Sequence, residues 1–265
     1  MIQLTKSAAA PSSLRRGVAA TADNCDRFDA DPGAYRSGEA EFVITGGIYG
    51  TQVVKRILKA DQHDKCAFCE AIFDANVAGD VEHYRPKGAV RTDAGVLRPG
   101  YYWLGYVWAN LSYACPDCNE YRKKDRFPLV VEADRVRDHH GNLADEQPLL
   151  LDPYGAKDPR EHIIFHGEAP IGVTDEGAAT IEVLALDRTK LARDRYRHLG
   201  HLSTLRESVL LLDGDLRPAA IDYVARVRAQ LAAAVLPEAK FSAAAADHLA
   251  ALAAGQNYLP VDEPA

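Results

Sequence analysis

Two cysteine pairs, Cys66-Ala-Phe-Cys69 and Cys115-Pro-Asp-Cys118, enclose the stretch of sequence that decides the fold. Each pair can grip a metal ion from a single turn of chain, and four thiolates are the number that a closed tetrahedral zinc site takes. The pairs are separated by 45 residues, more than in a compact zinc ribbon. The sequence therefore predicts a structural Zn²⁺ that pins together the two ends of an inserted unit.

Composition fits this interpretation. The chain has 265 residues, enough for one sizeable core with a smaller module inserted in it, and 47% of them are hydrophobic. We expect a cytoplasmic protein without membrane association, because no apolar run suits a secretory signal or a membrane span. Four paired cysteines then favour metal binding over disulfides, and the fifth, Cys25, is interpreted as a small apolar residue.

The charge distribution limits the class of partner. A net charge of −7 argues against a protein that coats nucleic acid electrostatically. Residues 81–128, however, carry eight basic and five acidic side chains, so this stretch is locally positive while the remainder carries −10. A small basic face on an acidic body suits local phosphate contact, although a solvated surface is the ordinary explanation of a charge run.

Secondary-structure signals divide the chain into three parts. Residues 1–45 have little periodicity and predict an N-terminal arm. Residues 46–130 form the zinc module, with a hairpin over 71–83 that turns at Asp74-Ala-Asn76 or Ala78-Gly79-Asp80. A surface loop over 88–100 and a helix from Pro116 follow it. Residues 131–265 are expected to be mainly helical.

Several elements are predicted outside the hairpin. Thr51 can cap a helix that leads to the first cysteine pair. Ile163-Ile164-Phe165 has strand character, and helical periodicity begins at Asp187 and continues to Leu212, with further helices over 218–235 and 239–254. The adjacent His139 and His140 could bind metal, but such a pair in a Gly/Asn turn is most often solvated.

The candidate catalytic and metal-binding residues are Glu82, His83 and Asn119. Adjacent strand residues point to opposite faces, so Glu82 and His83 can share a site only if the strand bulges or ends there. A neutral imidazole can accept a proton from water, which makes His83 a candidate general base. Glu82 and the Asn119 amide offer oxygen ligands that suit Mg²⁺ or Mn²⁺.

Basic residues flank this constellation. Arg85, Lys87 and Lys123 are expected to hold the phosphates on either side of a cleaved phosphodiester.

The stretch resembles the HNH nucleases, also called ββα-metal or His-Me finger nucleases. The resemblance lies in Glu82-His83 after the first cysteine pair, Asn110-Leu111, and Cys115-Pro-Asp-Cys118-Asn119 with Lys123 beyond. It implies an α+β fold, with a zinc-stapled ββα-metal module embedded in a mainly helical protein. Glu in place of the commoner Asp, and Asn in place of a final His, leave the metal preference open.

The resemblance also implies roles for single residues. His83 would activate water, Glu82 and Asn119 would bind the catalytic metal, and Asn110 would brace the loop that orients His83. The implied reaction is double-strand or nicking cleavage of DNA.

A wider likeness connects the chain with the HNH subunit of Septu-type and retron-associated anti-phage systems. It rests on Lys65-Cys-Ala-Phe-Cys-Glu70, Val81-Glu-His-Tyr-Arg-Pro-Lys87 and Tyr102-Trp-Leu-Gly-Tyr-Val-Trp-Ala-Asn-Leu111, and extends through Leu149-Leu-Leu-Asp-Pro153 and Leu184-Ala-Leu-Asp-Arg188. The likeness implies work beside an ATPase subunit.

Two other functions compete with the nuclease. A non-catalytic zinc module could bind DNA or a protein partner through Arg85, Lys87 and the Arg122–Lys124 cluster, but it has no need of Glu82-His83. A zinc-dependent hydrolase of small molecules would need an open zinc position, which four thiolates close.

Overall fold

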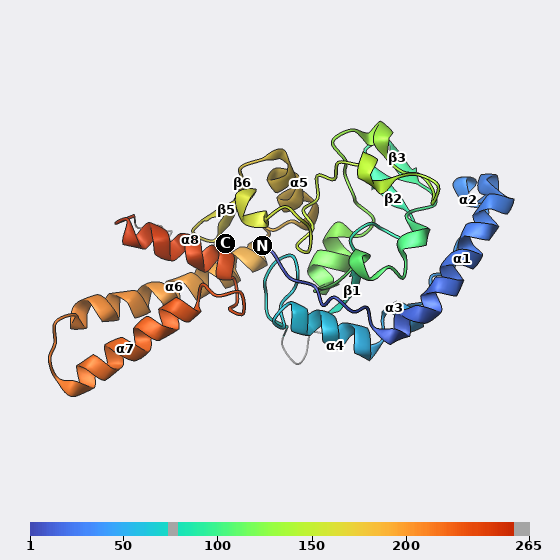
Figure 1. The fold of residues 1–265 in the computed structure, drawn as a ribbon. Helices are drawn as coiled ribbons and strands as arrows, with labels where there is room; N and C mark the ends of the chain where they lie inside the picture. Colours follow the sequence, from blue (N-terminus) through green and yellow to red (C-terminus); the bar gives the residue numbers. More distant parts are fainter. Residues whose placement is uncertain (74–78, 257–265) are drawn as a thin grey trace.

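The computed structural model describes residues 1–73 and 79–256, and these form a mixed α+β fold. Figure 1 shows an elongated molecule, with α1 and α2 at one end and the paired α6 and α7 at the other. The helices are α1 (Arg15–Ala30), α2 (Pro32–Ser37), α3 (Gly46–Tyr49), α4 (Gln52–Asp61), α5 (Asp175–Leu184), α6 (Thr189–Leu212), α7 (Pro218–Ala233) and α8 (Ser242–Ala253). The strands are β1 (Asp80–His83), β2 (Val90–Thr92), β3 (Gly95–Leu97), β4 (Leu111–Ala114), β5 (Ile163–His166) and β6 (Ala169–Gly172).

The central sheet pairs strands that are distant in the sequence. β1 runs antiparallel to β4, with Glu82 opposite Ser112, and a short, wide helix, η4 (Asp117–Lys123), follows β4 directly. The order is thus strand, strand, helix. Val81, Leu111 and Tyr113 of this sheet pack with Val54 and Leu58 of α4, which fixes the sheet on that helix.

The predicted hairpin over 71–83 is therefore wrong, because the partner of β1 is β4. Residues after the first cysteine pair return instead to Lys65, which forms an isolated bridge with Ile72. Pairing with β4 brings Leu111 and Tyr113 beside Val81 and buries all three against α4. Of the two predicted turns, Asp74-Ala-Asn76 lies outside the described residues and Ala78-Gly79-Asp80 does so in part.

Two segments that were predicted to be irregular contain regular secondary structure. The predicted surface loop over 88–100 contains the β2–β3 hairpin. The arm over 1–45 contains α1, whose buried residues, Gly17, Asn24 and Phe28, include only one large apolar side chain. Large apolar side chains are therefore few in its sequence, and no helix was predicted there. Gly17 lies against the Tyr106 ring, where a β-carbon would approach the Tyr106 Cβ to 2.3 Å.

The helices predicted from caps and periodicity are confirmed. The Thr51 hydroxyl accepts a hydrogen bond from the Val54 amide at the start of α4. The helix predicted from Asp187 appears as α6, and both α7 and α8 pack on it, while α8 also packs on β5. Over the described part of the chain, no helix combines the length and apolar character needed to cross a membrane.

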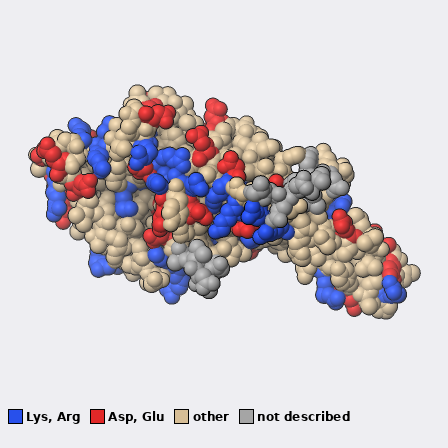
Figure 2. Space-filling model, turned by 180° about the vertical axis from the view of Figure 1, so that it is seen from behind, with Lys and Arg blue, Asp and Glu red and all other residues tan. Residues whose placement is uncertain are grey.

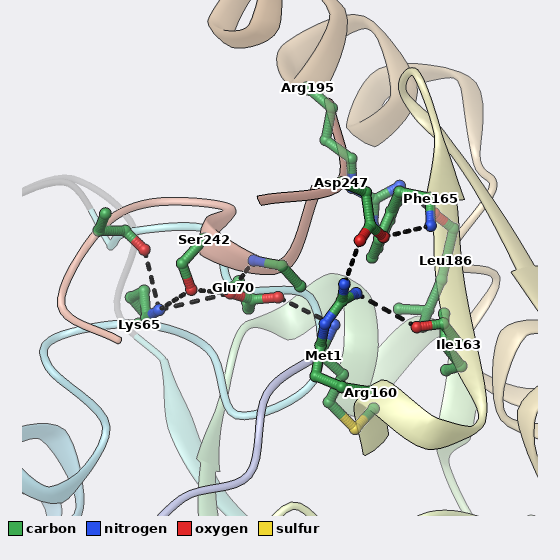
Figure 3. Close-up of polar contacts among 12 residues, drawn as sticks. Met1, Lys65, Glu70, Arg160, Ile163, Phe165, Leu186, Arg195, Ser242 and Asp247 are labelled. Atoms are coloured by element: carbon green, nitrogen blue, oxygen red, sulfur yellow. Dashed lines mark hydrogen bonds and ion pairs between the residues drawn. The ribbon is translucent and has the colours of Figure 1, made fainter. Parts of the chain in front are cut away.

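A buried ionic network joins the first cysteine pair to α8, as Figure 3 shows. The Glu70 carboxylate lies 2.9 Å from the α-ammonium of Met1 and 3.4 Å from the Lys65 Nζ, and it accepts a hydrogen bond from the Ser242 hydroxyl. Burial alone would raise the pKa of Glu70, but the Met1 and Lys65 cations lower it to about 2. Glu70 therefore stays ionised, and it ties residues 65–70 to the start of α8.

Replacement of this carboxylate should destabilise the protein. Glu70→Gln leaves two buried ammonium groups without their anion, so we expect the free energy of unfolding in urea to fall by about 3 kcal/mol. The matched control is Glu207→Gln on the exposed surface of α6, with a change within about 0.5 kcal/mol. An equally small effect of Glu70→Gln would show that the network contributes nothing to stability.

Candidate functional site

The four paired cysteines converge. The sulfurs of Cys66, Cys69, Cys115 and Cys118 all lie within 4.8 Å of one another, and the Cys69 and Cys115 sulfurs are 3.8 Å apart. A tetrahedron with zinc–sulfur bonds of about 2.3 Å separates its sulfurs by about 3.8 Å. The donor set and its spacing therefore fit a structural zinc ion, as the cysteine spacing predicts.

Arginine balances the charge of this cluster. Four thiolates around Zn²⁺ leave a net charge of about −2 in a buried place. The Arg188 guanidinium lies 3.6 Å from the Cys118 sulfur. Burial lowers the pKa of Arg188, but the neighbouring thiolates outweigh that effect and raise it overall. Arg188 follows α5 in the sequence, so the cluster is also tied to the C-terminal part of the chain.

A separate pocket of about 240 Å³ lies beside η4. Glu82, His83 and Asn119 all line it, together with Lys87 and Lys124. β1 ends at His83, which is the condition under which the adjacent Glu82 and His83 can share a site. Asn119 reaches the pocket from η4, where its backbone is held by bonds to Cys115 and Lys124.

His83 is held in one orientation. Its Nε2 lies 2.9 Å from the Gly105 carbonyl oxygen, and its ring packs edge-on against Tyr49 with centroids 4.6 Å apart. A carbonyl only accepts, so Nε2 carries the proton and Nδ1 has the free lone pair. Burial, assisted by the Lys87 cation, lowers the pKa of His83 to about 3 despite the bond to Gly105. The imidazole is therefore neutral near pH 7.

Glu82 forms a buried ion pair. The Lys123 Nζ donates to the Glu82 Oε1 at 2.6 Å and to the His83 carbonyl at 2.8 Å, and the Lys123 side chain is fully buried. The Lys123 cation therefore compensates the charge of the buried carboxylate. Lys123 therefore lies behind the pocket instead of on its surface, where a phosphate-binding lysine was expected.

Asn110 braces the chain on both sides of the pocket. Its side-chain oxygen accepts from the Arg85 amide at 2.8 Å, and its nitrogen donates to the carbonyls of Arg85 and Leu104. Leu104 directly precedes Gly105, whose carbonyl orients His83. Asn110 thus joins the two segments between which the imidazole is fixed.

The expected phosphate ligands separate into two groups. Lys87 lines the pocket, with its Nζ 5.1 Å from the centre of the Tyr49 ring. Arg85 instead donates to the Glu146 carboxylate at 2.9 Å and stacks over Phe127, so its guanidinium is engaged within the protein. Lys124, which the same basic run contains, is the second cation of the pocket.

Sequence reasoning missed three contributors to the two sites: the Gly105 carbonyl, the Tyr49 ring and Arg188. A backbone carbonyl leaves no residue-type signal. Tyr49 ends the short helix α3, which begins with Gly46 and Gly47, and Arg188 follows Leu186 and Asp187. Neither pattern indicates a contact with His83 or with sulfur.

Comparison with known proteins gives one informative relative. Over 171 residues the chain is 34% identical to the Septu protein PtuB of Bacillus mycoides (strain KBAB4). The aligned stretch is 63% of this chain and 57% of PtuB, so the chain spans less than two thirds of that relative. No protein-family model matches the chain, and no solved structure matches it either.

The zinc assignment predicts a selective effect of cysteine substitution. Cys69→Ser removes one of four ligands, so we expect zinc content, measured by atomic emission, to fall by about one ion per chain relative to the parent and the melting temperature to fall with it. Cys25→Ser is the matched control, because Cys25 lies outside the cluster, and it should retain a full zinc ion. Equal zinc content in both variants would contradict the assignment.

Proposed function

We propose that this chain is a metal-dependent endonuclease of the HNH type, which hydrolyses phosphodiester bonds of DNA. We further propose that it is the effector nuclease of a prokaryotic anti-phage defence system and acts beside an ATPase subunit. The single observation that carries the nuclease proposal is the pocket in which Glu82, His83 and Asn119 meet. The strand, strand, helix order of β1, β4 and η4 supports it as well.

The proposed reaction begins with proton transfer to His83. With Nε2–H fixed on the Gly105 carbonyl, Nδ1 is the nitrogen that accepts a proton from the attacking water. A base of such low pKa is weak. Burial is the main cause of the low pKa of His83 and the Lys87 cation adds to it, so an entering phosphodiester anion would offset the contribution of Lys87. The hydroxide attacks phosphorus, and the bond from phosphorus to the leaving oxygen breaks.

The donor set beside His83 suits a hard divalent cation. The Glu82 carboxylate and the Asn119 amide oxygen would hold Mg²⁺ or Mn²⁺, with water and a phosphate oxygen as further ligands. Such an ion, when bound, supplies electrostatic stabilisation of the transition state and of the leaving oxygen. Lys123 acts as a positioning residue, because its hydrogen bond orients Glu82.

Basic side chains near the pocket support an anionic substrate. Lys87 and Lys124 line the pocket itself, together with Asp125. Figure 2 shows that one face of the molecule carries Lys and Arg side chains in its middle, with Asp and Glu side chains beside them. A local basic area on an acidic protein favours contact with a few phosphates over broad coating of DNA. Similarity to the Septu protein PtuB supports the proposed place in a defence system.

Plasmid cleavage tests the nuclease proposal. The zinc-loaded chain should nick or linearise supercoiled plasmid in Mg²⁺ or Mn²⁺, and His83→Ala should lower the initial rate by at least about 100-fold while zinc content stays unchanged. His201→Ala, at an exposed position of α6, is the matched control and should cut like the parent. Binding of DNA without cleavage by the parent would instead support the non-catalytic zinc module.

Phage plating tests the proposed defence role. Cells that express the chain together with its genomic neighbours should plate phage less efficiently than cells without them, and His83→Ala should restore plating. Protection that persists in His83→Ala would contradict the role of this pocket as the effector site.

A further inference from the structure

A second group of metal-ligating side chains lies apart from the cysteine cluster and the His83 pocket. Asp29 lies in α1, and it faces His139 and His140, which lie in an irregular segment more distant in the sequence. One ligand atom of each residue lies within 4.8 Å of the others. The Asp29 Oδ1 is 2.8 Å from the His140 Nε2, and the Asp29 Oδ2 is 3.4 Å from the His139 Nε2. The histidine pair is therefore not simply solvated.

His139 is fixed by its surroundings. Its Nδ1 lies 2.5 Å from the Tyr102 hydroxyl, and its ring packs edge-on against the rings of Phe28 and Tyr102. When Nδ1–H donates to the Tyr102 oxygen, the lone pair of Nε2 is directed to the side where Asp29 lies. Metal-bound histidines commonly donate their second ring N–H in this way. His139 is thus held in the orientation that a metal ligand needs.

We propose that Asp29, His139 and His140 form a second binding site for a divalent transition metal of the zinc class. Two imidazoles and one carboxylate are the ligand types that such ions accept, whereas Mg²⁺ and Ca²⁺ prefer oxygen alone. Ligand bonds of about 2.0–2.1 Å place tetrahedral ligand atoms about 3.3–3.4 Å apart. The two histidine nitrogens lie 3.4 Å and 2.8 Å from different oxygens of the Asp29 carboxylate. The ligand atoms are therefore close to this spacing, and a small rotation of the carboxylate would bring one oxygen to face both nitrogens.

The second site differs chemically from the first. Three protein ligands leave one position for water, and the side chains of Asp29 and His140 are 47% and 64% exposed. We therefore expect an ion that binds more weakly than the one at the buried cysteines and exchanges with solvent.

The ion would act as a clamp between α1 and the chain around His139. α1 already touches this segment through the Phe28 ring, which packs against His139, and the neighbouring α2 does so through the ion pair of Arg36 with Asp138. α1 also packs on the turn that begins at Tyr102. A metal ion would add a coordinate link to this contact and hold the N-terminal helix against the body of the protein. This inference does not depend on the proposed nuclease activity.

Zinc stoichiometry tests the second site. The untagged full-length chain, first loaded with one zinc ion and then titrated with Zn²⁺, should take up a second ion by calorimetry and reach two per chain by native mass spectrometry. His140→Ala and Asp29→Asn should each stop at one ion. Tyr102→Phe should weaken the second site by about tenfold, because it removes the hydrogen bond that orients His139.

The matched control is again His201→Ala, which removes an exposed histidine elsewhere and should still bind two ions. Cobalt gives a second readout. Co²⁺ added to the zinc-loaded parent should produce visible d–d bands without thiolate charge transfer, and His140→Ala should lose them. A parent that stops at one ion, or a His140→Ala variant that binds two, would overturn the proposal.

Discussion

The four cysteine sulfurs hold together two segments that 45 residues separate, and the rest of the site depends on that link. Cys115 follows β4 directly, so the position of the cluster fixes the end of β4 and the start of η4. Since β1 pairs with β4, it also fixes Glu82 and His83. A metal ion that closes so long a loop removes much conformational freedom from the unfolded chain. Glu70, which follows Cys69 directly, links the first cysteine pair to α8 because its carboxylate accepts a hydrogen bond from Ser242.

The loop between β1 and β4 orients His83 through backbone groups. The chain leaves β1, forms the β2–β3 hairpin and returns past Gly105, whose carbonyl meets the His83 ring. Asn110 then joins Arg85, at the exit from β1, to Leu104. A conformationally free loop of this length could not hold an imidazole in place. The Asn110 hydrogen bonds fix the segment at Arg85 relative to the segment at Leu104, and so restrict the His83 ring between them.

Local signals in the sequence predicted local features correctly. Cysteine spacing predicted the metal cluster, Thr51 predicted the start of α4, and apolar periodicity predicted α6. The pairing of β1 was mispredicted because a hairpin is the nearest solution along the chain, whereas the burial of Leu111 and Tyr113 against α4 decided the pairing in three dimensions. Helix α1 was missed because few of its side chains are large and apolar, so its sequence resembles that of an irregular polar segment.

The candidate site itself was predictable as a set of residues but not in its charge arrangement. Glu82, His83 and Asn119 could be selected from the sequence, and the structure brings them to one pocket. Sequence alone treated the basic residues nearby as one phosphate-binding group. Burial separates them, because Lys123 pairs with Glu82 and Arg85 with Glu146, while Lys87 and Lys124 line the pocket.

This separation has a physical reason. A carboxylate that is almost completely enclosed needs a cation close to it, since an unpaired buried charge costs several kcal/mol. The Lys123 ammonium meets that need at 2.6 Å from Glu82 and also binds the His83 carbonyl, so it joins the two residues that the proposed reaction requires. Because Lys123 already neutralises Glu82, the pocket can form before any divalent ion arrives. In the proposed nuclease, metal binding is then a step of the reaction cycle and need not be a condition of folding, whereas an ion at the four cysteines would link the first cysteine pair to the segment that joins β4 and η4.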